Sequence, residues 1–243
     1  MFTKEQLETN LNNHPLIKTR LETLRLAEEI NTKFKNPHIV GGYLRNIILN
    51  TIPNDCDVSF QGYMFNQPGI LEAVQEAEGK LGIDHYPDWE FENISATGYS
   101  GDLYEDLVGK YSFHTDYLTL VIMNSKGKLS IGEQEKTLYD FNHQIYDLRF
   151  KGVEMWAIHR GNGRSFASCL TGDLTRGLYL CHSLDLTPSP IVTFLWSNYD
   201  SIFNKLSPED QKGRIVYWQK KTKGNPDYQK ILDAFGITSL KTD

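Results

Sequence analysis

The sequence predicts an α/β (α+β) fold in which a mixed sheet is flanked by helices and followed by a small C-terminal helical domain. Apolar residues three or four positions apart predict an amphipathic helix over residues 15–34. Apolar and alternating runs predict strands between residues 38 and 150, before helical patterns return. We therefore expect one domain of residues 1–165 and a helical domain of residues 166–243.

The composition is that of an ordinary soluble globular protein. The 243 residues are 40% hydrophobic and 23% charged, and the net charge of -6 argues against broad, nonspecific nucleic-acid binding. No apolar stretch suggests a membrane span or a secretory signal, so we expect a cytoplasmic protein without membrane contact. The three cysteines show no metal-ligand spacing and are expected to be free thiols.

The elements follow in order from the end of the first helix. A short strand at residues 38–40 leads into the glycine pair Gly41–Gly42, and "YLRNIILN" then predicts a helix of about two turns. "TIPN" is a turn, and "DCDVSF" is a strand in which alternate residues share a face. Residues 68–81 predict another helix, with proline near its start.

Strands are expected next in "EFENIS", "HTDYLTLVIM" and "TLYDFNHQIYDLRF", with a turn at "NSKGK". The glycine-rich, acidic residues 97–112 predict a long loop or lid. Helices are then predicted in "DLTRGLYLCHSLDL", in "TFLWSNYDSIFNKL", after "SPED" and in "NPDYQKILDAF". Ser207 is the expected cap of the third of these.

The stretch around the glycine pair has residues suited to phosphate and metal binding. A strand that enters Gly41–Gly42 at a helix N-terminus exposes backbone N–H groups, which favour an anion such as phosphate. Asp55 and Asp57 project from one face of a strand, while Cys56 points to the other. Paired carboxylates suit Mg²⁺, which also takes phosphate oxygens. Together they predict a nucleoside triphosphate site.

This arrangement resembles the nucleotidyltransferase (polymerase-β-like) superfamily. "VGGYLRNIILNTIPNDCDV" is similar to the head domain of the CCA-adding tRNA nucleotidyltransferase and bacterial poly(A) polymerase family. The positions that match its pattern in residue or character are Val40, Gly41, Gly42, Arg45, Ile48, Leu49, Pro53, Asp55 and Asp57.

The resemblance implies a nucleotidyltransferase sheet and Mg²⁺-dependent transfer of a nucleotide from ATP or CTP to an RNA 3′ end, tRNA above all, with Mn²⁺ as an alternative ion. It implies that Asp55, Asp57 and Asp116 are catalytic and bind the metal. The implied nucleotide-binding residues are Gly41, Gly42, Arg45, Asp140 and Arg176. Asp140 is an alternative to Asp116 as third carboxylate, and an internal salt bridge is an alternative role for Arg45.

Some positions depart from the family pattern. Asn46 stands where the family has aspartate, Leu138 and Tyr139 replace two arginines, and the Glu-Asp-x-x-Arg motif for base selection is not found. The chain is also much shorter than a full CCA-adding enzyme, which suits a compact, phage-type member. Two alternatives therefore stay open: transfer to a protein or small-molecule hydroxyl, and a non-catalytic nucleotide-binding or interaction module.

Overall fold

The structure is a computed structural model that describes residues 1–61, 67–93, 114–159 and 165–241. The predicted loop or lid at residues 97–112 lies outside these ranges. None of the helices in the described ranges combines the length and apolarity that a membrane span requires.

The chain forms two compact units. The first comprises residues 1–112 and 118–138, and the second comprises residues 113–117 and 139–243. The division near residue 138 lies earlier than the boundary near residue 165 that the sequence predicts.

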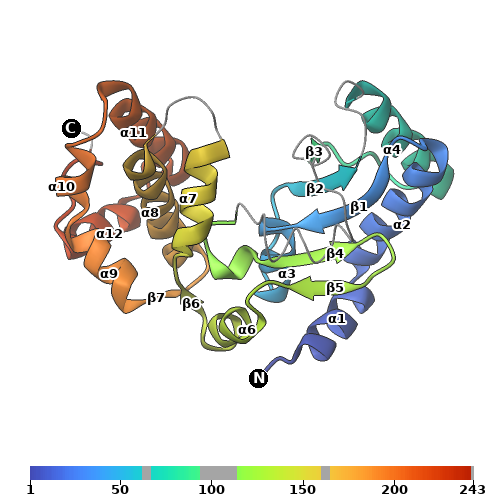
Figure 1. Cartoon of the computed structure of the whole chain (residues 1–243), viewed down its shortest axis with the longest axis horizontal. Coiled ribbons are helices and arrows are strands. Elements are labelled where there is room, and N and C mark those ends of the chain that lie inside the picture. Colours follow the sequence, from blue (N-terminus) through green and yellow to red (C-terminus); the bar gives the residue numbers. More distant parts are fainter. Residues whose placement is uncertain (62–66, 94–113, 160–164, 242–243) are drawn as a thin grey trace. The chain divides into compact units, whose positions relative to one another are not determined.

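The first unit contains the mixed sheet that the sequence predicts, and the structure shows five strands in the order β3-β2-β1-β4-β5 (Figure 1). Strand β1 pairs antiparallel with both β2 and β4, β4 pairs antiparallel with β5, and β2 pairs parallel with β3. The elements are α1 (Lys4–Asn13), α2 (Pro15–Ile30), β1 (Lys35–Val40), α3 (Gly42–Ile48), β2 (Cys56–Gln61), α4 (Gln67–Leu81), β3 (Trp89–Asn93), the 3-10 turn η2 (Tyr117–Thr119), β4 (Val121–Asn124) and β5 (Leu129–Ile131).

Helix α2 confirms the predicted amphipathic helix, and its apolar stripe is buried. Ile17, Leu21, Leu24 and Ala27 are all buried, and α2 lies alongside α4 (Figure 1). The helix ends at Ile30, before the end predicted from periodicity. Helix α1, which the sequence analysis does not predict, begins at a capping box between Thr3 and Gln6.

One face of the sheet forms the core of the first unit. Cys56, Val58 and Phe60 alternate along β2 with residues of the opposite face and are at most 1% exposed. The Phe60 ring centroid lies 5.1 Å from that of Phe34, and the Trp89 and Phe91 rings of β3 stack at 5.9 Å. Since neighbouring residues of a strand project from opposite faces, Asp57 lies on the face of β2 opposite to Cys56, Val58 and Phe60.

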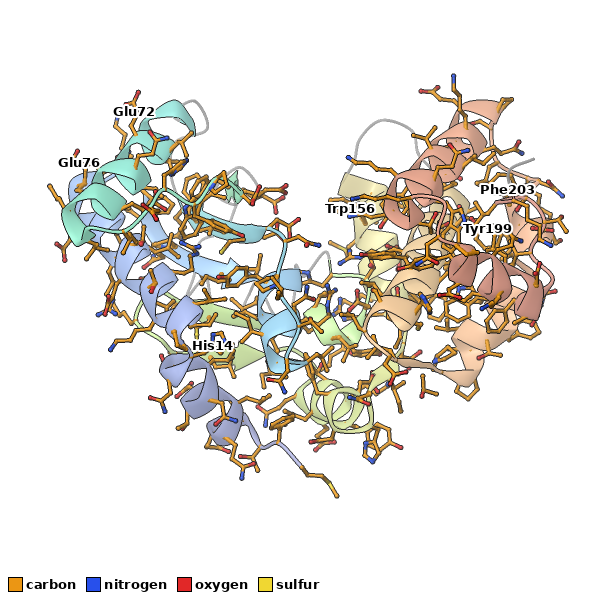
Figure 2. All side chains as sticks on the ribbon, turned by 180° about the vertical axis from the view of Figure 1, so that it is seen from behind. His14, Glu72, Glu76, Trp156, Tyr199 and Phe203 are labelled. Carbon is orange, nitrogen blue, oxygen red and sulfur yellow. The ribbon has the colours of Figure 1, made fainter. Side chains whose placement is uncertain are left out.

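The second unit is mainly helical and is built around α8. Trp196 donates a hydrogen bond of 3.1 Å to the Leu174 carbonyl, and Tyr199 shares a hydrogen bond of 2.6 Å with Thr175. The Tyr199 ring stacks on that of Phe203 (Figure 2). The elements are α6 (Gln134–His143), which crosses the division between the units, β6 (Ile145–Tyr146), α7 (Phe150–His159), α8 (Phe166–Ser183), β7 (Thr187–Pro188), α9 (Pro190–Ser197), α10 (Tyr199–Phe203), α11 (Pro208–Thr222) and α12 (Pro226–Phe235).

The strand predicted in "TLYDFNHQIYDLRF" is wrong for most of its length. Residues 137–143 belong to α6, residues 145–146 form the short strand β6, and α7 begins at Phe150. The buried positions Thr137, Asp140 and Phe141 follow the helical period of three to four residues. Aromatic residues with high strand propensity gave the wrong prediction because tertiary burial overrides propensity.

Two further predictions need correction. "HTDYLTLVIM" is extended only in part, because η2 precedes β4. The helix predicted over "TFLWSNYDSIFNKL" is two helices, since α9 ends at Ser197 and α10 starts at Tyr199. The predicted turn at "NSKGK" is confirmed between β4 and β5, where Gly127 has φ 82°. Ser207 caps α11 as predicted, accepting a hydrogen bond from the Asp210 amide.

Candidate active site

The glycine pair forms the turn between β1 and α3. Gly41 is the N-cap of α3 with φ 65° and ψ -126°, a combination that is almost restricted to glycine. Its amide donates a hydrogen bond of 3.4 Å to the Val121 carbonyl of β4. The conformation explains why a residue with a side chain is unsuited to this position.

The strand register brings the aspartate pair to the same end of the sheet as this turn. In the antiparallel β1–β2 pair, Ile39 lies opposite Val58. Because the strands are antiparallel, one residue forward in β1 and one residue back in β2 places Val40 beside Asp57, and the turn at Gly41 follows directly. Two segments that are separated in sequence thus meet where β1 ends and β2 begins (Figure 1).

The two carboxylates are accessible, whereas the cysteine between them is not. Asp55 is exposed, Asp57 is half-buried and Cys56 is fully buried, which is the predicted alternation. Burial raises the pKa of the Cys56 thiol well above its usual value, an effect that the Arg20 charge opposes. Cys56 is therefore a neutral core residue.

Sequence reasoning missed Glu90, a third carboxylate at this end of the sheet. In the parallel β2–β3 pair, Glu90 is the register partner of Asp57, and Glu90 is exposed. Register partners in neighbouring strands project from the same face of a sheet. The alternation of "DWEFEN" indicates a strand, but only the pairing places this residue beside Asp57.

Arg45 is directed into the protein next to the glycine turn. It is 5% exposed, and its Nε and Nη2 atoms donate to Asn46 Oδ1 at 3.0 and 2.8 Å. A side chain at Gly42 would place its Cβ 3.4 Å from Arg45 Nη2, so the guanidinium lies close to the turn. The Asn46 carbonyl in turn accepts from the Thr51 amide at 2.8 Å. Asn46 thus supplies the acceptor for Arg45 at the position where the resemblance predicts aspartate.

The other predicted site residues belong to the second unit. Asp116 is 1% exposed and forms an isolated β-bridge with Leu148. Burial acts to lower the pKa of Arg176, but the Asp116 carboxylate and other neighbours outweigh it and raise that pKa above its usual range. Asp140 lies on α6 and is fully buried, and not on a strand as predicted.

A second buried carboxylate lies near Arg176. Asp173 is 9% exposed and accepts a hydrogen bond of 2.9 Å from the Thr115 hydroxyl. Burial raises the pKa of Asp173 to about 6, although Arg176 and the Thr115 bond act to lower it. The predicted residues thus form two groups, namely Gly41, Gly42, Arg45, Asp55 and Asp57 in the first unit, and Asp116, Asp140 and Arg176 in the second.

Comparison with known proteins identifies the fold. No family model and no curated protein matches the chain in sequence. Solved structures do match: a CCA-adding enzyme with CTP has a TM-score of 0.60 and 12% identity over 96% of this chain. The CCA-adding enzyme of Thermotoga maritima with tRNA has a TM-score of 0.58 and 13% identity over 97% of it. That of Bacillus stearothermophilus with CTP has a TM-score of 0.58 and 12% identity over 93% of it.

These likenesses show that the chain has the nucleotidyltransferase fold of the CCA-adding enzymes, as the opening motif predicts. The chain spans about half the length of those enzymes, 53% of the first and 54% of the other two.

Proposed function

We propose that the protein is a Mg²⁺-dependent nucleotidyltransferase that transfers a nucleotide from ATP or CTP to an RNA 3′ end, with tRNA as the preferred acceptor. The observation that carries this proposal is the meeting of the Gly41 turn with Asp55 and Asp57 at one end of the sheet. The chain has the fold of CCA-adding enzymes, so this combination supports chemistry of the same kind.

The donor set fits a hard divalent cation. Asp55 is exposed and Asp57 is half-buried, and Mg²⁺ typically binds one or two carboxylates together with substrate phosphates. The described residues contain no group of three or more His, Cys, Asp or Glu side chains arranged to hold a metal ion. Such a site suits a metal ion that is also bound by a triphosphate better than a metal ion held by protein ligands alone. When bound, Mg²⁺ or Mn²⁺ supplies charge neutralisation at the phosphates.

The residues of the chain bind and orient the reactants. The backbone at Gly41 and Gly42 can approach the phosphates without side-chain interference. Asp55 and Asp57 would hold the metal ion that binds these phosphates and so orient the triphosphate. Arg45, whose guanidinium lies close to Gly42, adds positive charge behind the turn while Asn46 holds its orientation. The nucleotide-binding roles that the resemblance implies for Arg176 and Asp140 stay predictions.

For the third carboxylate we favour Glu90 over Asp116 and Asp140. Glu90 is exposed and is the register partner of Asp57. Asp116 and Asp140 are 1% and 0% exposed, and Asp116 interacts with the Arg176 guanidinium. Glu90 does not form a ready-made three-ligand group with Asp55 and Asp57. As an exposed carboxylate it can turn toward a metal that arrives with the triphosphate without breaking a buried interaction, which would be costly.

Transfer assays with the purified chain test this function. The chain is incubated with each α-labelled NTP, Mg²⁺ and tRNA that lacks its 3′ end, then with total RNA, and then with protein or small molecules alone. We expect label in tRNA, no label with EDTA, and loss of at least about a hundredfold in rate for Asp57→Asn. The exposed Asp84, changed to Asn, is the matched control and should keep wild-type activity.

The outcomes separate the alternatives. Label in a protein or small molecule, but not in RNA, would replace the proposed acceptor, a result that the net charge of -6 would suit. NTP binding without pyrophosphate release would identify a non-catalytic binding module. Full activity of Asp57→Asn would remove this carboxylate from the mechanism. In the same assay Glu90→Gln should lower the rate, whereas wild-type activity would reject Glu90 as third carboxylate.

A further inference from the structure

Arg20 of α2 contacts residues behind the candidate site. It is 9% exposed, and its guanidinium carbon lies 3.7 Å from the ring centroid of Tyr86 and 5.2 Å from that of Trp89. Burial raises the pKa of Tyr43, which is 1% exposed, and the neighbouring Arg20 charge and side-chain hydrogen bond act to lower it. Arg20 therefore connects α2 with α3, with β3 and with the loop before β3.

Each of these contacts is next to a residue of the candidate site. Tyr43 directly follows Gly42, and Trp89 directly precedes Glu90. The Tyr86 hydroxyl donates a hydrogen bond of 3.3 Å to the carbonyl of Asn54, the residue before Asp55. The Arg20 side chain thus contacts residues next to the glycine turn, next to Glu90 of β3 and next to the segment that carries Asp55.

The charge of Arg20 is compensated in an unusual way. Among the described residues no carboxylate forms an ion pair with it, and its Nε atom has no hydrogen-bond partner. A buried charge is normally paired, because burial without a partner is costly. Aromatic faces attract the guanidinium instead.

Glu78 of α4 holds the two aromatic residues in place. It is 1% exposed and accepts hydrogen bonds from Trp89 Nε1 at 2.9 Å and from the Tyr86 amide at 3.2 Å. Its other oxygen lies 2.6 Å from His85 Nδ1. The ring positions around Arg20 are therefore set by a satisfied buried carboxylate and not by packing alone.

We infer that Arg20 is a positioning residue that fixes the glycine turn and the acidic ends of β2 and β3 relative to one another. Its effect on catalysis rests on the proposed function. The alignment itself is a property of the protein without substrate, so it can be measured separately.

Amide hydrogen exchange of the full chain, measured by mass spectrometry, tests the alignment. Arg20→Met removes the charge and keeps most of the volume, Arg20→Lys restores the charge, and Arg25→Met changes an exposed arginine of the same helix as a control. In Arg20→Met we expect about tenfold faster exchange in peptides covering 41–46, 54–58 and 88–91, with the β4–β5 hairpin unchanged. Exchange in Arg20→Lys should stay within about threefold of the wild-type rate. Exchange in Arg25→Met should equal the wild-type rate.

Wild-type exchange in Arg20→Met, or faster exchange in only one of the three segments, would overturn the inference. If Arg20→Met does not fold, Tyr86→Ala gives the same test, because the half-exposed Tyr86 ring supplies the face on which Arg20 rests. Faster exchange in all three segments of that variant is the expected result, and unchanged exchange would contradict the inference.

The catalytic consequence has its own readout. In an active wild-type protein we expect Arg20→Met to lower kcat about tenfold, with KM for the NTP changed by less than about threefold, and Arg20→Lys to recover most of the kcat. Unchanged kcat despite faster exchange would remove Arg20 from catalysis. A wild-type protein without transfer activity would overturn the proposed function and leave the exchange result standing.

Discussion

At the scale of single residues, Gly41 has the most demanding backbone conformation of the candidate site. Its φ of 65° and ψ of -126° strain any residue with a Cβ atom. We expect Gly41→Ala to lower the free energy of unfolding by about 1–3 kcal/mol and to weaken NTP binding. Urea unfolding and NTP titration measure the two effects.

A second glycine gives the matched control for that substitution. Gly79 lies within α4, and a Cβ atom there meets nothing within 4 Å. Gly79→Ala should therefore raise the free energy of unfolding by up to about 1 kcal/mol through helix propensity. Equal stability changes for the two variants would contradict the assignment of strain to Gly41.

The raised pKa of Asp173 predicts how the free energy of unfolding depends on pH. Its pKa is raised from 3.8 to about 6, so between these values the folded protein holds a proton that the unfolded chain has released. This contribution to stability is fully present below pH 3.8 and is lost as the pH rises through about 6, on the order of 3 kcal/mol. Relative to wild type, Asp173→Asn should therefore become more stable as the pH rises from 4 to 7.

The measurement is urea unfolding of both proteins across that range. Buried His38 and half-buried His114, whose pKa values are lowered to about 4, act in the opposite direction, but they are present in both proteins and cancel in the difference. A difference in free energy of unfolding that does not change with pH would show that Asp173 titrates normally.

At the scale of elements, α8 depends on a glycine for its packing against β6. A Cβ atom at Gly177 would overlap the ring of Tyr146, whose hydroxyl donates to the Asp173 carbonyl at 3.2 Å. We expect Gly177→Ala to lower the free energy of unfolding by about 1–3 kcal/mol, because overpacking forces the ring or the helix to move. Chemical denaturation measures the change.

The control for this element is Gly213 of α11, where a Cβ atom meets nothing within 4 Å. Gly213→Ala should be neutral or stabilising. The Gly177 prediction fails if Gly177→Ala is as stable as Gly213→Ala. The pair also tests whether the close approach of Tyr146 holds the short strand β6 in place.

At the scale of the whole molecule, ligand binding should stabilise the unit that contains the glycine turn and the aspartates. ATP with Mg²⁺ at about 100 times its Kd should add about 2.7 kcal/mol to the stability of that unit. Native-state amide exchange of β1 and β2 measures this as a gain in protection. Replacing Mg²⁺ by EDTA, or Asp57 by Asn, should remove the gain, whereas Asp84→Asn should keep it. Equal protection in wild type and Asp57→Asn would contradict the assignment.

The sequence alone determined the features that depend on neighbouring residues. The stripe of α2, the Gly41 turn, the alternation around Cys56 and the Ser207 cap follow from local periodicity and backbone conformation. The ungapped motif from Val40 to Asp57 also predicted the fold that the solved structures identify. These signals are readable because each lies within one short segment.

Only the tertiary structure decided the features that depend on pairing and burial. The parallel register of β2 and β3 brought Glu90 beside Asp57, and the packing of α2 brought Arg20 behind both strands. Burial also made a helix of the residues around Asp140. The physical reason is that contacts between distant segments determine which strands pair and which charges are buried. The free-energy cost of burying a charge depends on the groups around it, and a local sequence pattern does not contain that information.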